Sequence, residues 1–250
     1  MRIALVGNSH LAAFKAAEPQ ILAAHPGLEL SYFGLPNPIF FQSGKKNGTA
    51  LNLRQPPARN RAQMIVEDGP HRLDFAAYDL VLLASHGFFF RHVVEALEGV
   101  DILGHPRRNN DGPLISLGCA ADLAETSIRH YAKRLHRFMP EVDNMAVILA
   151  PHPATSAAPL DRGLAWLAAH PARDRLFAAW RERLIASCGA RGLPLFEPPQ
   201  ALMAGPFQTR GEYARATGLA GDEAMHLGNH LHMTSAYAAA VMDEVLAALG

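Results

Sequence analysis

Short apolar runs that alternate with helix-like segments constrain this chain more than any other feature. Predominantly apolar runs, typical of strands buried on both faces, occupy residues 3–6, 78–84 (with Asp79 as its one charged residue), 145–149 and, more weakly, 193–196. Residues 28–33 alternate like a strand. Amphipathic helical patterns separate these runs. Strands that alternate with helices predict a parallel sheet covered on both faces. We therefore expect a three-layer α/β fold, with a five-stranded parallel flavodoxin-like sheet in the order 2-1-3-4-5.

The length and the composition indicate a single globular domain. The 250 residues are 49% hydrophobic and 18% charged, which excludes intrinsic disorder and suits one domain spanning residues 1–250. The one long stretch without a helix or strand pattern covers about residues 35–70 and is rich in Pro, Gly, Asn, Arg and Gln. We interpret it as an irregular insertion, since loops of this length commonly form lids, binding loops or oligomer contacts.

The charge balance indicates which classes of partner the protein binds, and the cysteine count indicates its cellular compartment. Lys plus Arg and Asp plus Glu both number 23, so no net positive field attracts nucleic acid or anionic lipid. No apolar run approaches the roughly 20 residues that span a bilayer, and the first run is too short for a signal peptide. Two cysteines without CxxC spacing suit a reducing compartment. We expect a cytoplasmic protein that binds neither nucleic acid nor membranes, and the sequence leaves homo-oligomerisation open.

A serine stands where the first predicted strand meets the first predicted helix. The strand ends in Gly7-Asn8-Ser9-His10, which places the Ser9 hydroxyl at the positive end of a helix dipole, near free backbone N–H groups. Serine is a preferred helix cap and needs no chemistry to occur here. It also suits a nucleophile whose oxyanion the local amides would stabilise. A general base elsewhere in the chain favours the second interpretation.

Candidate bases gather just before the last predicted helix. A nucleophilic serine needs a general base, usually histidine, which a third group usually orients. The segment before the helix contains Asp222, His226, Asn229, His230 and His232.

Together, the two ends of the chain resemble the SGNH hydrolases, also called the GDSL lipase/esterase superfamily. Members of that family have a Gly-Asp-Ser or Gly-Asn-Ser block after the first strand and an Asp-x-x-His block before the final helix. Gly7-Asn8-Ser9 matches the first block, and His232 with Tyr237 five residues later matches the frame of the second. The resemblance implies that Ser9 is the nucleophile, that His232 is the base, and that no cofactor is needed.

The orienting residue departs from the family pattern. The frame that selects His232 puts Asn229, not an aspartate, three residues before it. An asparagine carbonyl can accept the Nδ1–H hydrogen bond but cannot stabilise imidazolium by charge. Two alternatives stay open: Asp222 reaches the histidine from outside the motif, or His226 is the base, with Asp222 four residues before it.

The oxyanion donors of the family match less clearly. By resemblance, Gly34 after the second strand would donate its amide, with Gly44 and Gly48 as competitors. The family's Gly-x-Asn-Asp block after the third strand is replaced here by Ala-Ser-His-Gly, so His86 or the Gly87 amide would stand in for its asparagine. A plain strand-to-helix turn explains the same residues. The next three residues, Phe88-Phe89-Phe90, would line an acyl pocket or pack in the core.

These residues favour a serine-dependent ester hydrolase or acyl transferase. Ser9 would attack a carbonyl, with His232 first as general base and then as general acid. The resemblance extends to enzymes that act on O-acetylated carbohydrates, so the expected partner is a small-molecule or carbohydrate ester.

Two other functions compete with this one. A metal-dependent hydrolase would use His226, His230 and His232, joined by His86 or His152. A non-catalytic, glycan-binding descendant of the fold would explain why the third residue and the middle block are altered.

Overall fold

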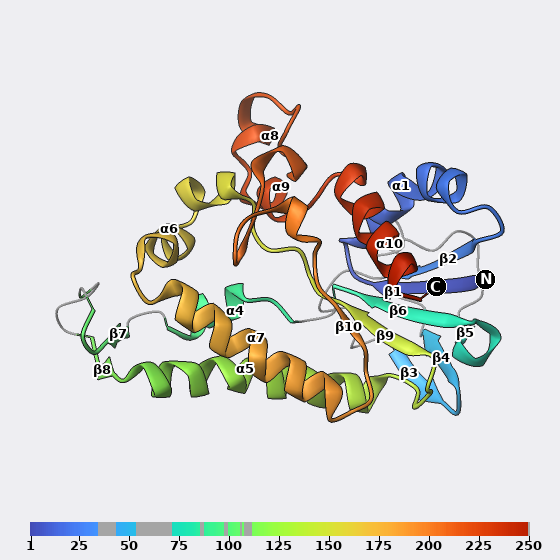
Figure 1. The fold of residues 1–250 in the computed structure, drawn as a ribbon, viewed down its shortest axis with the longest axis horizontal. Coiled ribbons are helices and arrows are strands. Elements are labelled where there is room, and N and C mark those ends of the chain that lie inside the picture. The colour runs from blue at the N-terminus through green and yellow to red at the C-terminus, as the bar shows by residue number, and fades with distance from the viewer. Residues whose placement is uncertain are drawn as a thin grey trace.

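The computed structural model describes residues 1–34, 44–53, 72–85, 88–97, 100–105, 107 and 112–249. It is an α/β fold with a five-stranded parallel sheet at its centre. The strands lie side by side in the order β2-β1-β6-β9-β10 (Figure 1). Their bounds are β1 (Arg2–Gly7), β2 (Glu29–Gly34), β6 (Leu80–Ala84), β9 (Met145–Ile148) and β10 (Leu195–Phe196).

The unbroken apolar pattern of the inner strands follows from burial on both faces. In β1, Ile3 and Leu5 join one hydrophobic cluster, while Ala4 and Val6 join the other. The side chains of β6 and β9 divide between the two clusters in the same way. Successive strand residues point to opposite faces, so a strand with two buried faces needs apolar residues at every position.

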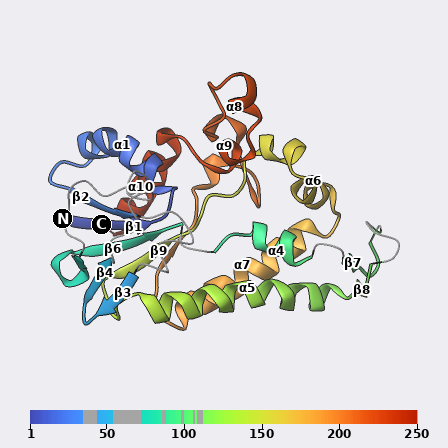
Figure 2. The same ribbon diagram turned by 180° about the vertical axis from the view of Figure 1, so that it is seen from behind.

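Four long helices pack against the sheet and contribute to these clusters. Side chains of α1 (Leu11–Ala24) and α10 (Ser235–Leu249) pack with the cluster that contains Ile3. Side chains of α5 (Leu117–Phe138) and α7 (Arg173–Gly189) pack with the other one. Figure 2 shows α1 and α10 on one side of the sheet and α5 and α7 on the other.

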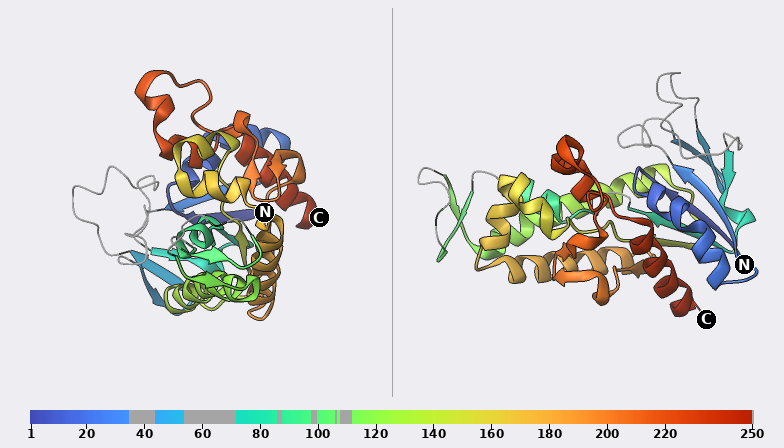
Figure 3. Two further views of the ribbon diagram at one scale, coloured as in Figure 1. Left: turned by 90° about the vertical axis from the view of Figure 1, so that its left-hand side faces the viewer. Right: turned by 90° about the horizontal axis from the view of Figure 1, so that it is seen from above.

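The helices α5 and α7 extend beyond the carboxyl edge of the sheet and carry a second layer of short helices. Two of these are α4 (Arg91–Ala96), which contacts α5, and α6 (Arg162–Ala169), which contacts both α4 and α7. Figure 3 shows this extension from above, with the sheet at one end of the molecule and α6 toward the other. The carboxyl edge of the sheet, where ligands bind in open parallel sheets, therefore borders α4 and α6.

Part of the stretch that the sequence predicts to be irregular is regular, so that prediction is wrong for residues 44–53. Strands β3 (Gly44–Asn47) and β4 (Ala50–Leu53) form an antiparallel hairpin, and β5 (Arg72–Asp74) pairs with β4. Gly48 makes the tight connection with φ of +59°, a value that glycine adopts without strain. Residues 35–43 and 54–70 lie outside the described residues.

Shorter elements complete the described chain. They are η1 (Phe75–Ala77), β7 (Asp101–Ile102), β8 (Leu114–Ile115), η2 (Thr155–Leu160), η3 (Gln200–Leu202), β11 (Met203–Gly205), β12 (Gln208–Thr209), η4 (Gly211–Tyr213), α8 (Gly221–Met225) and α9 (Leu227–Leu231). Among the helices of the described residues, none has the length and apolar character needed to cross a membrane.

Candidate active site

The structure brings Ser9 and His232 into direct contact. Ser9 follows β1, and His232 lies between α9 and α10. The Oγ of Ser9 is 2.9 Å from the Nε2 of His232, within the range of a hydrogen bond. The two residues are 223 positions apart in the sequence, and it is the fold that joins them. This is the contact that a serine nucleophile and its histidine base require.

A backbone carbonyl sets the orientation of the His232 ring. The Nδ1 of His232 lies 2.7 Å from the carbonyl oxygen of Gly228. Because a carbonyl oxygen can only accept a hydrogen bond, Nδ1 must carry the proton in the neutral ring. The Nε2 lone pair is then free to accept the hydrogen bond that the Ser9 hydroxyl donates. The Gly228 carbonyl therefore selects the tautomer that a general base needs.

Asn229 does not orient His232, and the expectation that it does is wrong. Its Nδ2 donates hydrogen bonds to the Glu223 carbonyl at 2.8 Å and to the Glu223 Oε2 at 3.3 Å. Asn229 is buried, and its backbone N–H donates to the His226 carbonyl. The side chain thus joins α8 to α9. Because α9 places Gly228 rather than Asn229 against the His232 ring, the main chain takes the role that the motif gives to a carboxylate.

The other candidate groups near the C-terminus do not contact His232 among the hydrogen bonds and ion pairs of the described residues. Asp222 and His226 are both exposed. His230 is buried; its Nδ1 is 2.8 Å from the Ser156 Oγ and its Nε2 is 2.7 Å from the Ala224 carbonyl. Both nitrogens of His230 are thus engaged in holding α9 in place.

The Ser9 hydroxyl is not the cap of helix α1. The Oδ1 of Asn8 accepts a hydrogen bond from the His10 backbone N–H at 3.0 Å, and the Asn8 Nδ2 donates to the Ser85 carbonyl at 2.7 Å. Asn8 is buried and ties the start of α1 to the end of β6. The Ser9 side chain is exposed, with its hydroxyl directed to His232.

His10 is a residue of this site that the sequence analysis did not identify. Its ring stacks on the ring of His232 with centroids 4.7 Å apart and an interplanar angle of 23°. Burial, and then the nearby His232, lowers the pKa of His10 to about 3. His10 therefore stays neutral beside His232 and adds no positive charge that would oppose protonation of the base. Its position directly after the serine was the only signal in the sequence.

A cavity of about 260 Å³ opens at the Ser9–His232 pair. Most of its surface comes from the turn after β1, the start of α4, and the loop after β9. Phe89 and Phe90 both line it, although Phe90 and Phe88 also belong to the hydrophobic core. The phenylalanine run therefore contributes both to the core and to the lining of the cavity beside Ser9. The lining residues are Asn8, Ser9, His10, Phe89, Phe90, Arg91, His92, Glu95, Pro151, Pro153, Leu231 and His232.

Of the predicted oxyanion donors Gly34, His86 and Gly87, the structure describes only Gly34. Gly34 ends β2 beside Gly7, which ends β1. A Cβ at Gly34 would lie 2.6 Å from the Leu11 Cδ1, and one at Gly7 would lie 2.4 Å from the Ala84 carbonyl oxygen. Close packing at the start of α1 therefore requires glycine at both positions. His86 and Gly87 lie outside the described residues.

Three buried polar atoms line a small cavity behind the site. They are the Nδ1 of His10, the Oγ of Ser85 and the OH of Tyr237, none of which has a hydrogen-bond partner within the described chain. Ser85 follows β6 with φ of +58°, a strained value for a residue with a Cβ. Burial raises the pKa of Tyr237, which keeps its hydroxyl protonated. No residue pattern around Ser85 signals this strain.

Four histidines of the metal hypothesis lie in the described part of the chain and do not form a metal site there, and the fifth, His86, lies outside it. In the described part of the chain, no group of three or more His, Cys, Asp or Glu side chains could hold a metal ion. Both ring nitrogens of His230 and of His232 are engaged. His152 is buried against Phe177 and Trp180, and burial lowers its pKa to about 4.

Comparisons with known proteins do not place the chain in a family: no protein-family model matches it, and no curated protein matches it either.

Replacing Asn229 with aspartate tests the role of this residue. We expect Asn229→Asp to lower stability by about 1–3 kcal/mol at neutral pH, since a buried amide donor is lost and a carboxylate faces Glu223. If the Ser9–His232 pair hydrolyses an ester, its turnover should not rise, because the substituted side chain points away from His232. Thermal unfolding and kcat/KM of the variant are the measurements. Asn47→Asp, at an exposed hairpin position, is the matched control. An increase in kcat/KM would show that a carboxylate at position 229 reaches His232.

Proposed function

We propose that this protein is an SGNH-type serine ester hydrolase or acyl transferase. The observation that carries the proposal is the 2.9 Å contact between the Ser9 Oγ and the His232 Nε2. The Nδ1 contact with Gly228 supports it, since the contact leaves Nε2 as the basic nitrogen. The strand order β2-β1-β6-β9-β10 supports the three-layer, flavodoxin-like arrangement that the resemblance implies.

The proposed reaction begins with attack of the Ser9 oxygen on the ester carbonyl carbon. The Ser9 proton passes to the His232 Nε2, and the carbonyl oxygen becomes an oxyanion. When the tetrahedral intermediate collapses, His232 returns this proton to the departing alkoxide, which leaves as the alcohol. An acyl-serine remains. Water in a hydrolase, or an acceptor alcohol in a transferase, then attacks the acyl group with His232 again as the base.

In the described part of the chain, the proposed base has a backbone carbonyl, and no carboxylate, at its Nδ1. The imidazolium formed in each step keeps its Nδ1–H hydrogen bond to the Gly228 carbonyl, whose dipole stabilises the charge less than a full negative charge would. The neutral ring of His10 covers one face of His232 and shields it from water. We therefore expect a dyad that is slower than a complete Ser-His-Asp triad.

The Ser9 amide is the best-placed candidate for an oxyanion donor. The next backbone amides are already used: that of His10 by the Asn8 side chain, and those at positions 11–13 by the carbonyls of residues 8–10. The Gly34 and Gly87 amides and the His86 ring remain the proposed further donors, by resemblance to the family. An acyl group would occupy the largely apolar part of the cavity beside Phe89 and Pro151.

Active-site labelling tests the proposed function. We expect a fluorophosphonate to label the wild-type protein once, at Ser9, and to abolish hydrolysis of acetyl esters. EDTA should leave that hydrolysis unchanged, since no step of the proposed mechanism uses a metal ion. Mass spectrometry of the labelled peptide and turnover with and without EDTA are the measurements. Labelling elsewhere, or none at all under conditions that label a known serine esterase, would contradict the proposal.

Among the described residues, no carboxylate contacts the His232 ring, and this favours one alternative, a glycan-binding descendant that has lost catalysis. In that case a panel of acetylated saccharides would bind without being hydrolysed. The same labelling experiment separates the two, because a serine without an effective base would not react with the fluorophosphonate.

A further inference from the structure

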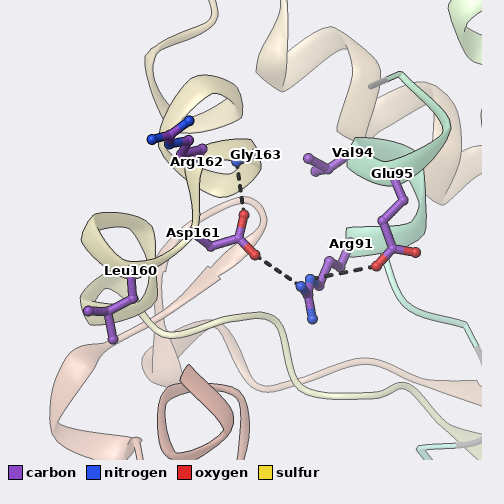
Figure 4. Close-up of a pocket in the computed structure, with 7 residues that line it drawn as sticks. All are labelled: Arg91, Val94, Glu95, Leu160, Asp161, Arg162 and Gly163. Carbon is purple, nitrogen blue, oxygen red and sulfur yellow. Dashed lines mark hydrogen bonds and ion pairs between the residues drawn. The ribbon is translucent and has the colours of Figure 1, made fainter. Parts of the chain in front are cut away.

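The protein has a second cavity, of about 490 Å³, which Figure 4 shows. It lies between α4 and the start of α6. Arg91 and Glu95, on α4, line both cavities, so a ligand that extends from Ser9 along α4 enters the second one. From the side of α6, the second cavity is lined by Asp161 and Arg162.

The polar groups of this cavity are held by the fold. The Oδ1 of Asp161 caps helix α6, accepting hydrogen bonds from the backbone N–H groups of Gly163 at 2.9 Å and Leu164 at 3.0 Å. The Oδ2 of Asp161 accepts a hydrogen bond from the Nη2 of Arg91 at 3.0 Å, as Figure 4 shows. A Cβ at Gly163 would lie 2.8 Å from the Val94 Cγ1, so α4 and α6 approach too closely for any larger residue. The Arg91 guanidinium is thereby fixed in place before a ligand binds.

Hydrogen-bonding capacity remains on both sides of the cavity. Arg91 has five N–H groups, of which one bonds Asp161, while its Nε lies 3.7 Å from the Glu95 Oε1. The Glu95 side chain is 55% exposed and can accept further hydrogen bonds. Arg162 has no ion pair or side-chain hydrogen bond among the described residues. The cavity therefore offers both donors and acceptors to a ligand.

The charge of the lining indicates which ligands fit. Two arginines, Arg91 and Arg162, are balanced by two carboxylates, Glu95 and Asp161. An anionic ligand would compete with Asp161 for Arg91 and would meet Glu95. A neutral ligand with several hydroxyl groups would instead accept hydrogen bonds from the arginines and donate them to Glu95, without a net charge to desolvate.

We propose that this second cavity binds the alcohol part of the ester substrate, a neutral saccharide or similar polyol, while the acyl group occupies the cavity at Ser9. This inference rests on the proposed function, and it adds the residues that select the substrate. Arg91, Glu95 and Arg162 are the groups that would recognise the hydroxyls. Asp161 is a positioning residue, since it acts through Arg91 and the start of α6.

The test compares two kinds of acetyl ester. The probes are monoacetylated methyl glycosides of glucose, galactose and mannose, and ethyl acetate as an ester without a hydroxylated alcohol. We expect Glu95→Gln and Arg162→Gln each to lower the ratio of kcat/KM for the best glycoside ester to that for ethyl acetate by about tenfold, as expected for the loss of a hydrogen bond to a charged group. The change should appear mainly in KM. Arg129→Gln, on α5, is the matched control and should leave the ratio unchanged.

Binding without turnover separates this inference from the proposed function. Calorimetry with Ser9→Ala and the unacetylated methyl glycosides should show binding that Arg162→Gln weakens in the same background. If wild type hydrolyses ethyl acetate but the variants keep the wild-type ratio, the second cavity does not bind the alcohol and the inference is overturned, while the proposed function stands. If the wild type hydrolyses no ester, yet Arg162→Gln weakens glycoside binding, the proposed function fails and the saccharide site is retained. Absence of glycoside binding overturns the inference.

Discussion

Ser9→Ala is expected to lower kcat for a substrate ester by about 10³-fold or more, because removing the nucleophile from a serine–histidine pair costs several orders of magnitude in rate. The substitution removes one exposed oxygen that does not cap helix α1, so the fold should not change. Purified variant and wild type should therefore show the same thermal unfolding curve. Initial rates at saturating ester are the measurement.

A second serine provides the control for this result. Ser187→Ala on α7 removes a hydroxyl that, among the described residues, accepts a hydrogen bond from Arg191 alone, and it should leave the rate at the wild-type value. Retained turnover in well-folded Ser9→Ala protein would show that Ser9 is not the nucleophile of the hydrolysis.

The sequence predicts the Ser9–His232 contact because both residues stand beside elements with strong patterns. A fully buried strand such as β1 requires apolar residues throughout, and Gly7 marks its end. His232 is placed by the amphipathic helix that follows it. The ends of parallel strands and the starts of the next helices meet at one edge of a sheet. The end of β1 and the start of the last helix therefore predict that Ser9 and His232 lie close together.

The orienting group of His232 was not predictable in the same way. A motif search looks for a side chain at a fixed spacing, and Asn229 occupies that spacing. Which group faces the ring depends on the backbone of α9, which turns the Gly228 carbonyl toward His232 and the Asn229 amide toward Glu223. A main-chain carbonyl is present at every residue, so no residue type signals this role.

The second cavity escaped the sequence analysis for a related reason. Arg91 and Asp161 are 70 positions apart, and each alone is typical of a solvated charge. They meet because α4 and α6 lie against each other beyond the sheet, a packing that depends on Gly163 and on the paths of the loops. The hairpin β3–β4 was missed because its strands are only four residues long and β3, Gly-Lys-Lys-Asn, contains no apolar residue.

His232→Ala is expected to lower kcat nearly as much as Ser9→Ala, by about 10²–10⁴-fold, since the hydroxyl of Ser9 is a weak nucleophile without a base. The control is His226→Ala, which removes an exposed histidine six residues away and should retain wild-type turnover. Wild-type turnover in His232→Ala, together with its loss in His226→Ala, would show that the base is His226.

Combining the two active-site substitutions tests whether the pair acts as a unit. If His232 acts only by taking the Ser9 proton, it has no function once the hydroxyl is gone. The double variant Ser9→Ala/His232→Ala should then be no slower than Ser9→Ala alone, although independent effects would multiply to about 10⁵-fold or more. If the fold-losses of the two single variants multiply in the double variant, His232 stabilises the transition state without Ser9, for example by activating water directly. The 2.9 Å contact and the single basic nitrogen that Gly228 leaves on the ring favour the coupled result.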